Sequence, residues 1–70
     1  MEYVLVSFNE ARTVFVDGVP MGKTNMMLQI QEGTHEFNLG APVNYTPPNK
    51  LAIVVGTTPV SPHLIKFEQI

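Results

Sequence analysis

The stretch that comes nearest to known chemistry is residues 18–24, GVPMGKT, which is similar to the phosphate-binding loop of nucleotide-hydrolysing proteins. That loop has four residues between its glycines, so that backbone amides surround a phosphate, and a helix follows it. Here only three residues separate Gly18 from Gly22, Pro20 removes an amide donor, and the residues that follow alternate as in a strand. We therefore expect a hairpin turn at this position.

Carboxylates and histidines are the other groups that could do chemistry. Asp17 and Glu32 are expected in turns that point in opposite directions, so they would not flank one glycosidic bond as acid and base. Glu36 is expected on a solvated face. His35 falls on the expected inner face, where a lone histidine usually anchors a neighbouring loop, although a pH switch or a ligand contact is the alternative. His63 is expected at the exposed start of a strand.

No combination of side chains in the sequence has the spacing of a catalytic or metal site. Neither Ser7 nor Ser61 has a neighbouring base that would activate it as a nucleophile. The chain has two histidines and no cysteine, and its carboxylates lack the spacing of metal ligands. The sequence predicts a protein that is not an enzyme and that carries no metal and no cofactor.

The composition predicts one small folded domain over residues 1–70. With 44% hydrophobic and 14% charged residues, the chain is too apolar to be disordered. Because it has no cysteine, disulfides cannot support the thin core of so short a chain. Core packing must therefore stabilise it, helped by any self-association.

Charge and hydropathy limit the partners. The net charge is −2, and the four basic residues are too scattered to form the basic patch of a nucleic-acid-binding protein. No apolar run reaches the roughly 18 residues of a membrane span. Glu2 stands where a signal peptide carries positive charge, so no export signal is predicted and a cytoplasmic location fits the sequence.

Alternating apolar and polar residues between glycine and proline turns predict a small antiparallel β-sandwich of about six strands. The expected strands are residues 2–8, 13–17, 24–31, 34–39, 51–55 and 63–69. The run at 51–55 is apolar on both faces, which is typical of a strand covered on both sides. Residues 40–50 contain three of the six prolines and are expected to form a crossing loop.

The centre of the predicted fold is a hairpin formed by residues 24–31 and 34–39. Met26, Leu28 and Ile30 share one face of the first strand. Placing Ile30 opposite His35 sets Leu28 opposite Phe37 and keeps polar residues together on the other face. Turn residues are expected on either side of the strand at 24–31, and they are Asp17, Gly18, Gly22, Glu32 and Gly33.

The middle of the chain resembles the PEGA domain. The resemblance rests on VFVDG at residues 14–18, on Gly22 and Thr24, and on EGTH at residues 32–35. It differs from the family pattern at the namesake turn, which reads QEGT at residues 31–34, and at Asn25, where proline commonly follows the threonine. The resemblance implies a transthyretin-like β-sandwich that usually forms one module of secreted or cell-envelope proteins. It implies no catalytic residues.

Two functions from different classes follow. The preferred one is a protein-interaction or scaffold module that pairs an exposed edge strand with itself or with a partner strand. The other is a module that binds cell-surface glycans through Tyr45 and Pro47, unless Tyr45 instead packs against the end of the sandwich. Phe15 and Met27, expected as diagonal neighbours on the outward face, are either contacts to a second sheet or an exposed partner contact.

Overall fold

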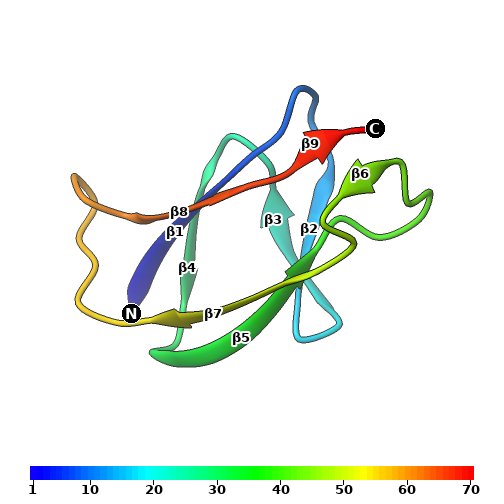
Figure 1. Ribbon diagram of the computed structural model, residues 1–70. Helices are drawn as coiled ribbons and strands as arrows, with labels where there is room; N and C mark the ends of the chain where they lie inside the picture. Colours follow the sequence, from blue (N-terminus) through cyan, green and yellow to red (C-terminus); the bar gives the residue numbers. More distant parts are fainter.

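The computed structural model describes all of residues 1–70, which form strands and turns without any helix (Figure 1). No helix is therefore present that could cross a membrane. The chain has nine strands, more than the six expected, and they are β1 (Glu2–Ser7), β2 (Thr13–Val16), β3 (Val19–Lys23), β4 (Met27–Ile30), β5 (Gly33–Asn38), β6 (Tyr45–Thr46), β7 (Lys50–Val54), β8 (His63–Lys66) and β9 (Glu68–Gln69).

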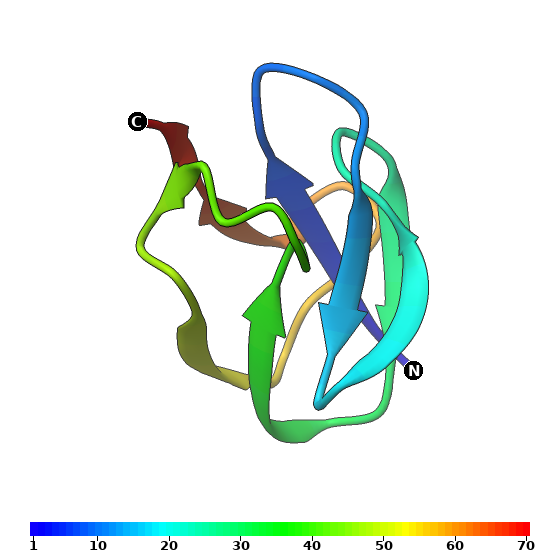
Figure 2. The ribbon, with the colours of Figure 1, turned by 90° about the vertical axis from the view of Figure 1, so that its right-hand side faces the viewer.

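The strands form two larger sheets that face each other as in a small β-sandwich (Figure 2). One sheet has the order β4-β1-β8, the other has the order β3-β2-β5-β7, and β6 pairs with β9 in a short third sheet. All pairs are antiparallel except β1 with β8, which are parallel. The core between the sheets consists of Val4, Val6, Phe8, Val14, Val16, Leu28, Ile30, Phe37, Leu39, Tyr45, Val54, Ile65 and Phe67.

The first two strands follow the alternation of the sequence. Val4 and Val6 on β1 are fully buried, and Val14 and Val16 on β2 are buried against them in the same core. The β2–β3 turn is a two-residue hairpin turn in which Asp17 and Gly18 both have positive φ, +53° and +82°. A type I′ hairpin turn requires positive φ at both central positions, and Asp-Gly is one of the residue pairs that adopt it readily.

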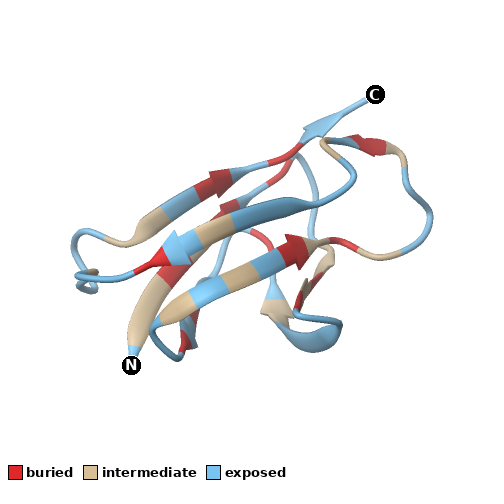
Figure 3. Cartoon of the chain, turned by 60° about the horizontal axis from the view of Figure 1, so that its bottom comes forward, coloured by how far each residue is buried: buried red, intermediate tan, exposed pale blue.

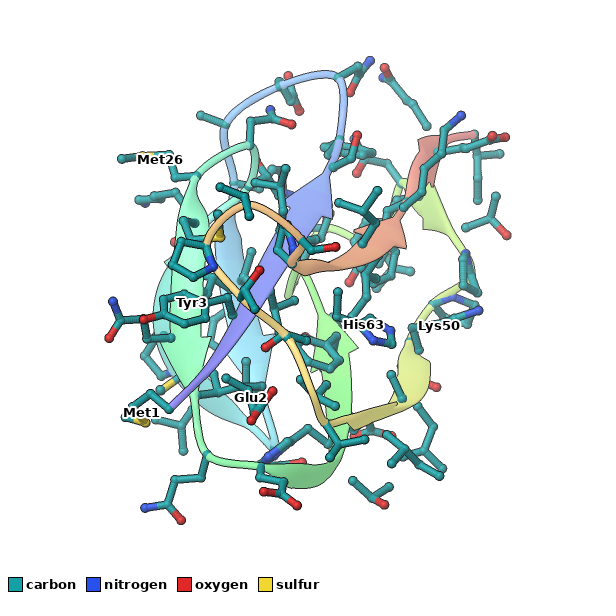
Figure 4. All side chains as sticks on the ribbon, turned by 90° about the vertical axis from the view of Figure 1, so that its left-hand side faces the viewer. Met1, Glu2, Tyr3, Met26, Lys50 and His63 are labelled. Carbon is teal, nitrogen blue, oxygen red and sulfur yellow. The ribbon has the colours of Figure 1, made fainter.

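The predicted strand at residues 24–31 is wrong, because the chain changes sheets within it. Asn25 has φ +64° and turns the chain away from β3. Its N–H donates to the carbonyl of Val6 (2.7 Å), and its side-chain oxygen accepts from the N–H of Phe8 (3.2 Å). These bonds start β4 beside β1. Met26 lies on the turn and is 62% exposed instead of facing the core (Figure 4).

The predicted pairing of Leu28 with Phe37 is also wrong. Leu28 on β4 lies opposite Val4 on β1, whereas Phe37 on β5 lies opposite Val16 on β2. Both side chains are buried as expected, but they enter the core from opposite sheets. The alternation of a strand determines which residues face inward, and it does not determine which strand lies beside it.

The second half of the chain differs from its predicted pattern in two places. The loop at 40–50 contains the short strand β6, which pairs with β9 at the end of the chain. Strand β7 is covered on one face only, since Leu51 and Ile53 are exposed and Val54 is buried. The run at 51–55 therefore carries an uncovered apolar face that the sequence pattern did not indicate.

Candidate interaction edge

Strand β7 forms one edge of the larger sheet, and no strand lies on its outer side (Figure 2). Its one neighbour in the sheet is β5. From Leu51 onward, exposed residues alternate with half-buried or buried ones, as they do along β5 (Figure 3). Ala52 and Val54 face the core, whereas Leu51 and Ile53 lie on the outer face and are each 68% exposed. Val55, just beyond the strand, is exposed as well.

The backbone groups of these two exposed residues point away from the sheet. The carbonyl of Glu36 accepts a 2.8 Å hydrogen bond from the N–H of Asp17, the residue after β2. The backbone of Glu36 therefore faces β2. Successive residues direct their N–H and C=O to alternate sides, so the backbone of His35 faces β7 and that of its register partner Ala52 faces β5. The N–H and C=O groups of Leu51 and Ile53 therefore lie on the free side.

The other edge strands carry features that discourage pairing. Strand β3 contains Pro20, which has no N–H to donate, and it ends in Lys23. Strand β8 follows Pro62 and ends in Lys66, and β4 is four residues long. Short strands, prolines and lysines are the usual protection of sheet edges. On β7 the one such residue is Lys50 at its start (Figure 4), which leaves the apolar part of the edge unprotected.

The motif residues expected in turns have several structural roles. Gly33 has φ +136° and begins β5, directly after the connection from β4 that contains Glu32. Gly22 is not in a turn but within β3. A Cβ built on Gly22 would lie 2.2 Å from Cδ2 of Leu28, so the glycine allows the two sheets to approach closely. Thr24 is buried, accepting from the N–H of Arg12 (2.9 Å) and donating to a neighbouring carbonyl.

Asp17 and His35 form an ion pair between two of these motifs. Nδ1 of His35 donates to Oδ2 of Asp17 at 2.6 Å, and Nε2 donates to the carbonyl of Gln31 at 2.7 Å. The bond to Asp17 raises the pKa of His35, and the Gln31 carbonyl adds to this while burial opposes it. The backbone N–H of Glu36, followed by His35, lowers the pKa of Asp17.

This arrangement corrects the expected direction of the two turns and the expected burial of His35. The turns that carry Asp17 and Glu32 lie at the same end of the sandwich instead of at opposite ends, because the extra reversal at residues 24–26 turns the chain once more (Figure 1). His35 is half-buried at the edge of the core and binds the chain segment before β5. Both of its ring nitrogens are engaged by protein acceptors, and no group of three His, Cys, Asp or Glu side chains gathers anywhere in the structure.

Tyr45 is a core residue and does not contact solvent as a glycan-stacking side chain would. It is 1% exposed, and its hydroxyl accepts from the N–H of Leu39 (3.2 Å) and donates to the carbonyl of Gly40 (2.9 Å). Its ring packs edge-on against Phe67, with centroids 5.5 Å apart. Pro47 is half-buried. The loop therefore packs onto the end of the sandwich, and Tyr45 offers no surface to a sugar.

Phe15 and Met27 are not the neighbours that the predicted register implied. Phe15 lies on β2 and is half-buried, with its ring against Gly40. Met27 lies on β4, in the other sheet, and is exposed opposite Leu5. The two side chains belong to different faces of the sandwich and do not form one contact patch.

The residues that sequence reasoning missed are Leu51, Ile53 and Arg12. The guanidinium of Arg12 donates to the carbonyls of Leu39, Gly40 and Pro42, and it lies 5.1 Å from the ring of Tyr45. No local pattern marks this role. For Leu51 and Ile53 the apolar run was visible, but only the strand order shows that it forms an uncovered edge.

These features define a small all-β module of two facing sheets, with an Asp-Gly hairpin turn, a buried threonine and an Asp–His ion pair. The chain belongs to the PEGA domain family, since the family model described as PEGA domain matches residues 2–54. No curated protein and no solved structure matches the chain.

Proposed function

We propose that this PEGA domain is a non-enzymatic protein-interaction module that binds an extended polypeptide segment as an added strand along β7. The observation that carries the proposal is the coincidence, at Leu51 and Ile53, of outward backbone groups with apolar side chains that are 68% exposed. The outward backbone groups would form main-chain hydrogen bonds with an added strand, and the exposed apolar side chains would pack against it. This mode of recognition is strand addition to an exposed sheet edge.

The energetics favour a partner strand that is itself apolar on one face. Each cross-strand pair of side chains contributes about 0.2–1 kcal/mol, so two or three pairs on the outer face would add a modest but selective term. The backbone bonds add affinity without regard to sequence. A partner segment with apolar residues at alternate positions would satisfy both requirements.

The glycan-binding alternative loses its main support. It required an exposed aromatic ring on the proline-rich loop, and Tyr45 is buried with its hydroxyl bonded to backbone groups on both sides. No other aromatic residue of that loop exists. We therefore keep strand addition at β7 as the proposed function.

The test uses a displayed library of short random peptides, selected against the folded domain. We expect selected peptides to show alternating apolar residues and to shift the amide resonances of Leu51 and Ile53 more than those of β3. Ile53→Pro should abolish binding and leave the fold intact, because the N–H that it removes points to the free side and proline is tolerated there.

The matched control is Ala52→Pro, whose N–H faces β5 and whose loss should unfold the edge instead. A second control, Leu64→Lys, adds a charge at an equally exposed leucine on β8, in the other sheet, and should leave binding unchanged. Peptides that bind elsewhere on the domain, or that bind Ile53→Pro as well as the unaltered chain, would contradict the proposal.

A further inference from the structure

Strand β7 is complementary to itself, which gives the proposed edge a specific occupant. We propose that a second copy of this chain pairs with β7, antiparallel and symmetrically, with Ala52 on the two-fold axis. This inference rests on the proposed function and names the partner for it. It is argued from the side chains and the backbone directions of β7.

The symmetric register satisfies the free backbone groups in pairs. The strand runs from Lys50 to Val54, so Ala52 is its central residue. Antiparallel pairing centred there sets Leu51 opposite Ile53 of the second copy, and Ile53 opposite its Leu51. These are the residues whose N–H and C=O point outward, so each of the two pairs exchanges both backbone bonds.

The same register brings together side chains that suit one another. The two apolar residues of each copy meet across the axis on the outer face, where β-branched and aliphatic pairs stabilise a sheet. The small side chain of Ala52 lies at the axis, where the two strands approach most closely. Lys50 falls opposite Val54 of the second copy, so the two lysines lie at opposite ends of the ribbon and do not repel each other.

The assembly closes at two copies. Pairing joins the two four-stranded sheets into one sheet of the order β3-β2-β5-β7-β7-β5-β2-β3. Each β7 is then paired on both sides, and both outer edges of the joined sheet are β3. In β3, Pro20 interrupts the row of backbone donors. A symmetric interface of this kind forms a closed dimer and not a fibre.

The absence of cysteine from the chain permits a clean test by disulfide trapping. In the proposed register the two Ala52 residues form a non-hydrogen-bonded pair, whose Cβ atoms lie about 4.5–5.5 Å apart, close to the range that a disulfide spans. Under mild oxidation we expect Ala52→Cys to form a linked dimer at least tenfold faster than Val60→Cys. Val60 is 94% exposed on the loop before β8 and serves as the control.

Sedimentation equilibrium over a dilution series gives an independent measurement. The unaltered chain should pass from dimer to monomer on dilution, whereas Ile53→Lys should stay monomeric at concentrations at least tenfold higher. The same lysine placed at Leu64 should leave the dimer unchanged. These readings do not require the cysteine variant, so a folding defect in Ala52→Cys would not decide the question.

The outcomes separate this inference from the proposed function. A chain that is monomeric throughout, with equal trapping of the two cysteine variants, overturns self-pairing. If selected peptides still shift Leu51 and Ile53, strand addition stands with a different partner, and if they do not, both fail. A dimer that persists in Ile53→Lys uses another surface and also overturns the inference.

Discussion

His35 donates a hydrogen bond from Nδ1 to Asp17 at 2.6 Å and one from Nε2 to the carbonyl of Gln31 at 2.7 Å. Asp17 follows β2 in the larger sheet, and Gln31 follows β4 in the smaller one. One imidazole ring from β5 therefore connects the ends of strands in both sheets. Only the protonated ring can donate from both nitrogens, which couples the connection to pH.

The first prediction concerns that coupling. The pKa of His35 is raised, so its stabilising effect is fully present below the unfolded value of about 6.5 and is lost as pH rises through the higher folded value. The pKa of Asp17 is lowered, so its effect is present above about pH 4 and is lost as pH falls through its folded value. Urea unfolding at a series of pH values should show the pair's contribution at its largest between these limits.

Two variants isolate the pair from the other ionisable groups. His35→Gln should remove the decline in the free energy of unfolding above about pH 6.5, and Asp17→Asn should lower the pKa of His35 in an NMR titration. Parallel stability profiles for His35→Gln and the unaltered chain would show that the imidazole does not act as described.

The second prediction concerns the contact between the two sheets at Gly22 and Leu28. Gly22→Ala adds a methyl group only 2.2 Å from the present position of Cδ2 of Leu28. Leu28 is buried, so it can give way only by disturbing its neighbours. We expect a loss of about 1–3 kcal/mol in chemical denaturation, the range for an overpacked core. Leu28→Ala added to Gly22→Ala should relieve the clash, so the double variant should lose less than the sum of the single ones.

The third prediction concerns the hydroxyl of Tyr45. Tyr45→Phe keeps the ring against Phe67 but leaves the N–H of Leu39 without its acceptor. Leaving a buried donor unpaired costs about 1–3 kcal/mol, and the denaturation midpoint should fall accordingly. Tyr3→Phe is the control, since Tyr3 lies on the outer side of β1 and is only half-buried (Figure 4). Equal effects of the two substitutions would argue against the bonds described for Tyr45.

The fourth prediction concerns the residues beyond the family match at 2–54. Ile65 and Phe67 are each 2% exposed and complete the core. A chain that ends at Val54 should therefore lack dispersed amide resonances and cooperative unfolding. In the full-length chain, Phe67→Ala should cost about 3–5 kcal/mol, which is a large share of the stability expected for so small a domain. A folded fragment of residues 1–54 would show that these two side chains are dispensable.

Local features of this fold were predictable because short-range chemistry determines them. Val4 and Val6 are buried together because strand residues alternate, and Asp17–Gly18 turns because both residues accept positive φ. The inward positions of Leu28 and Phe37 follow from the same alternation. Each of these results depends on a few neighbouring residues, so a single sequence contains the necessary information.

Long-range relationships were not predictable in this way. The change of sheet at Asn25 depends on bonds to Val6 and Phe8, which are distant in sequence. Tyr45 is buried because its strand pairs with β9 and its side chain packs in the core, and no local pattern signals this. A run that is apolar on both sides predicts a covered strand, whereas the outer face of β7 is exposed. Only the order of strands in the sheet reveals that Leu51 and Ile53 lie on an edge.

The parallel pairing of β1 with β8 has a consequence for the order of events during synthesis. Val4 lies opposite His63 and Val6 lies opposite Ile65, so β1 must wait for β8, which is made after all the strands between them. Until residue 66 has left the ribosome, β1 has β4 on one side and an open edge on the other. The nascent domain therefore keeps one edge of β1 unpaired until β8 is available, and any chaperone that protects extended apolar segments would find its target at this edge.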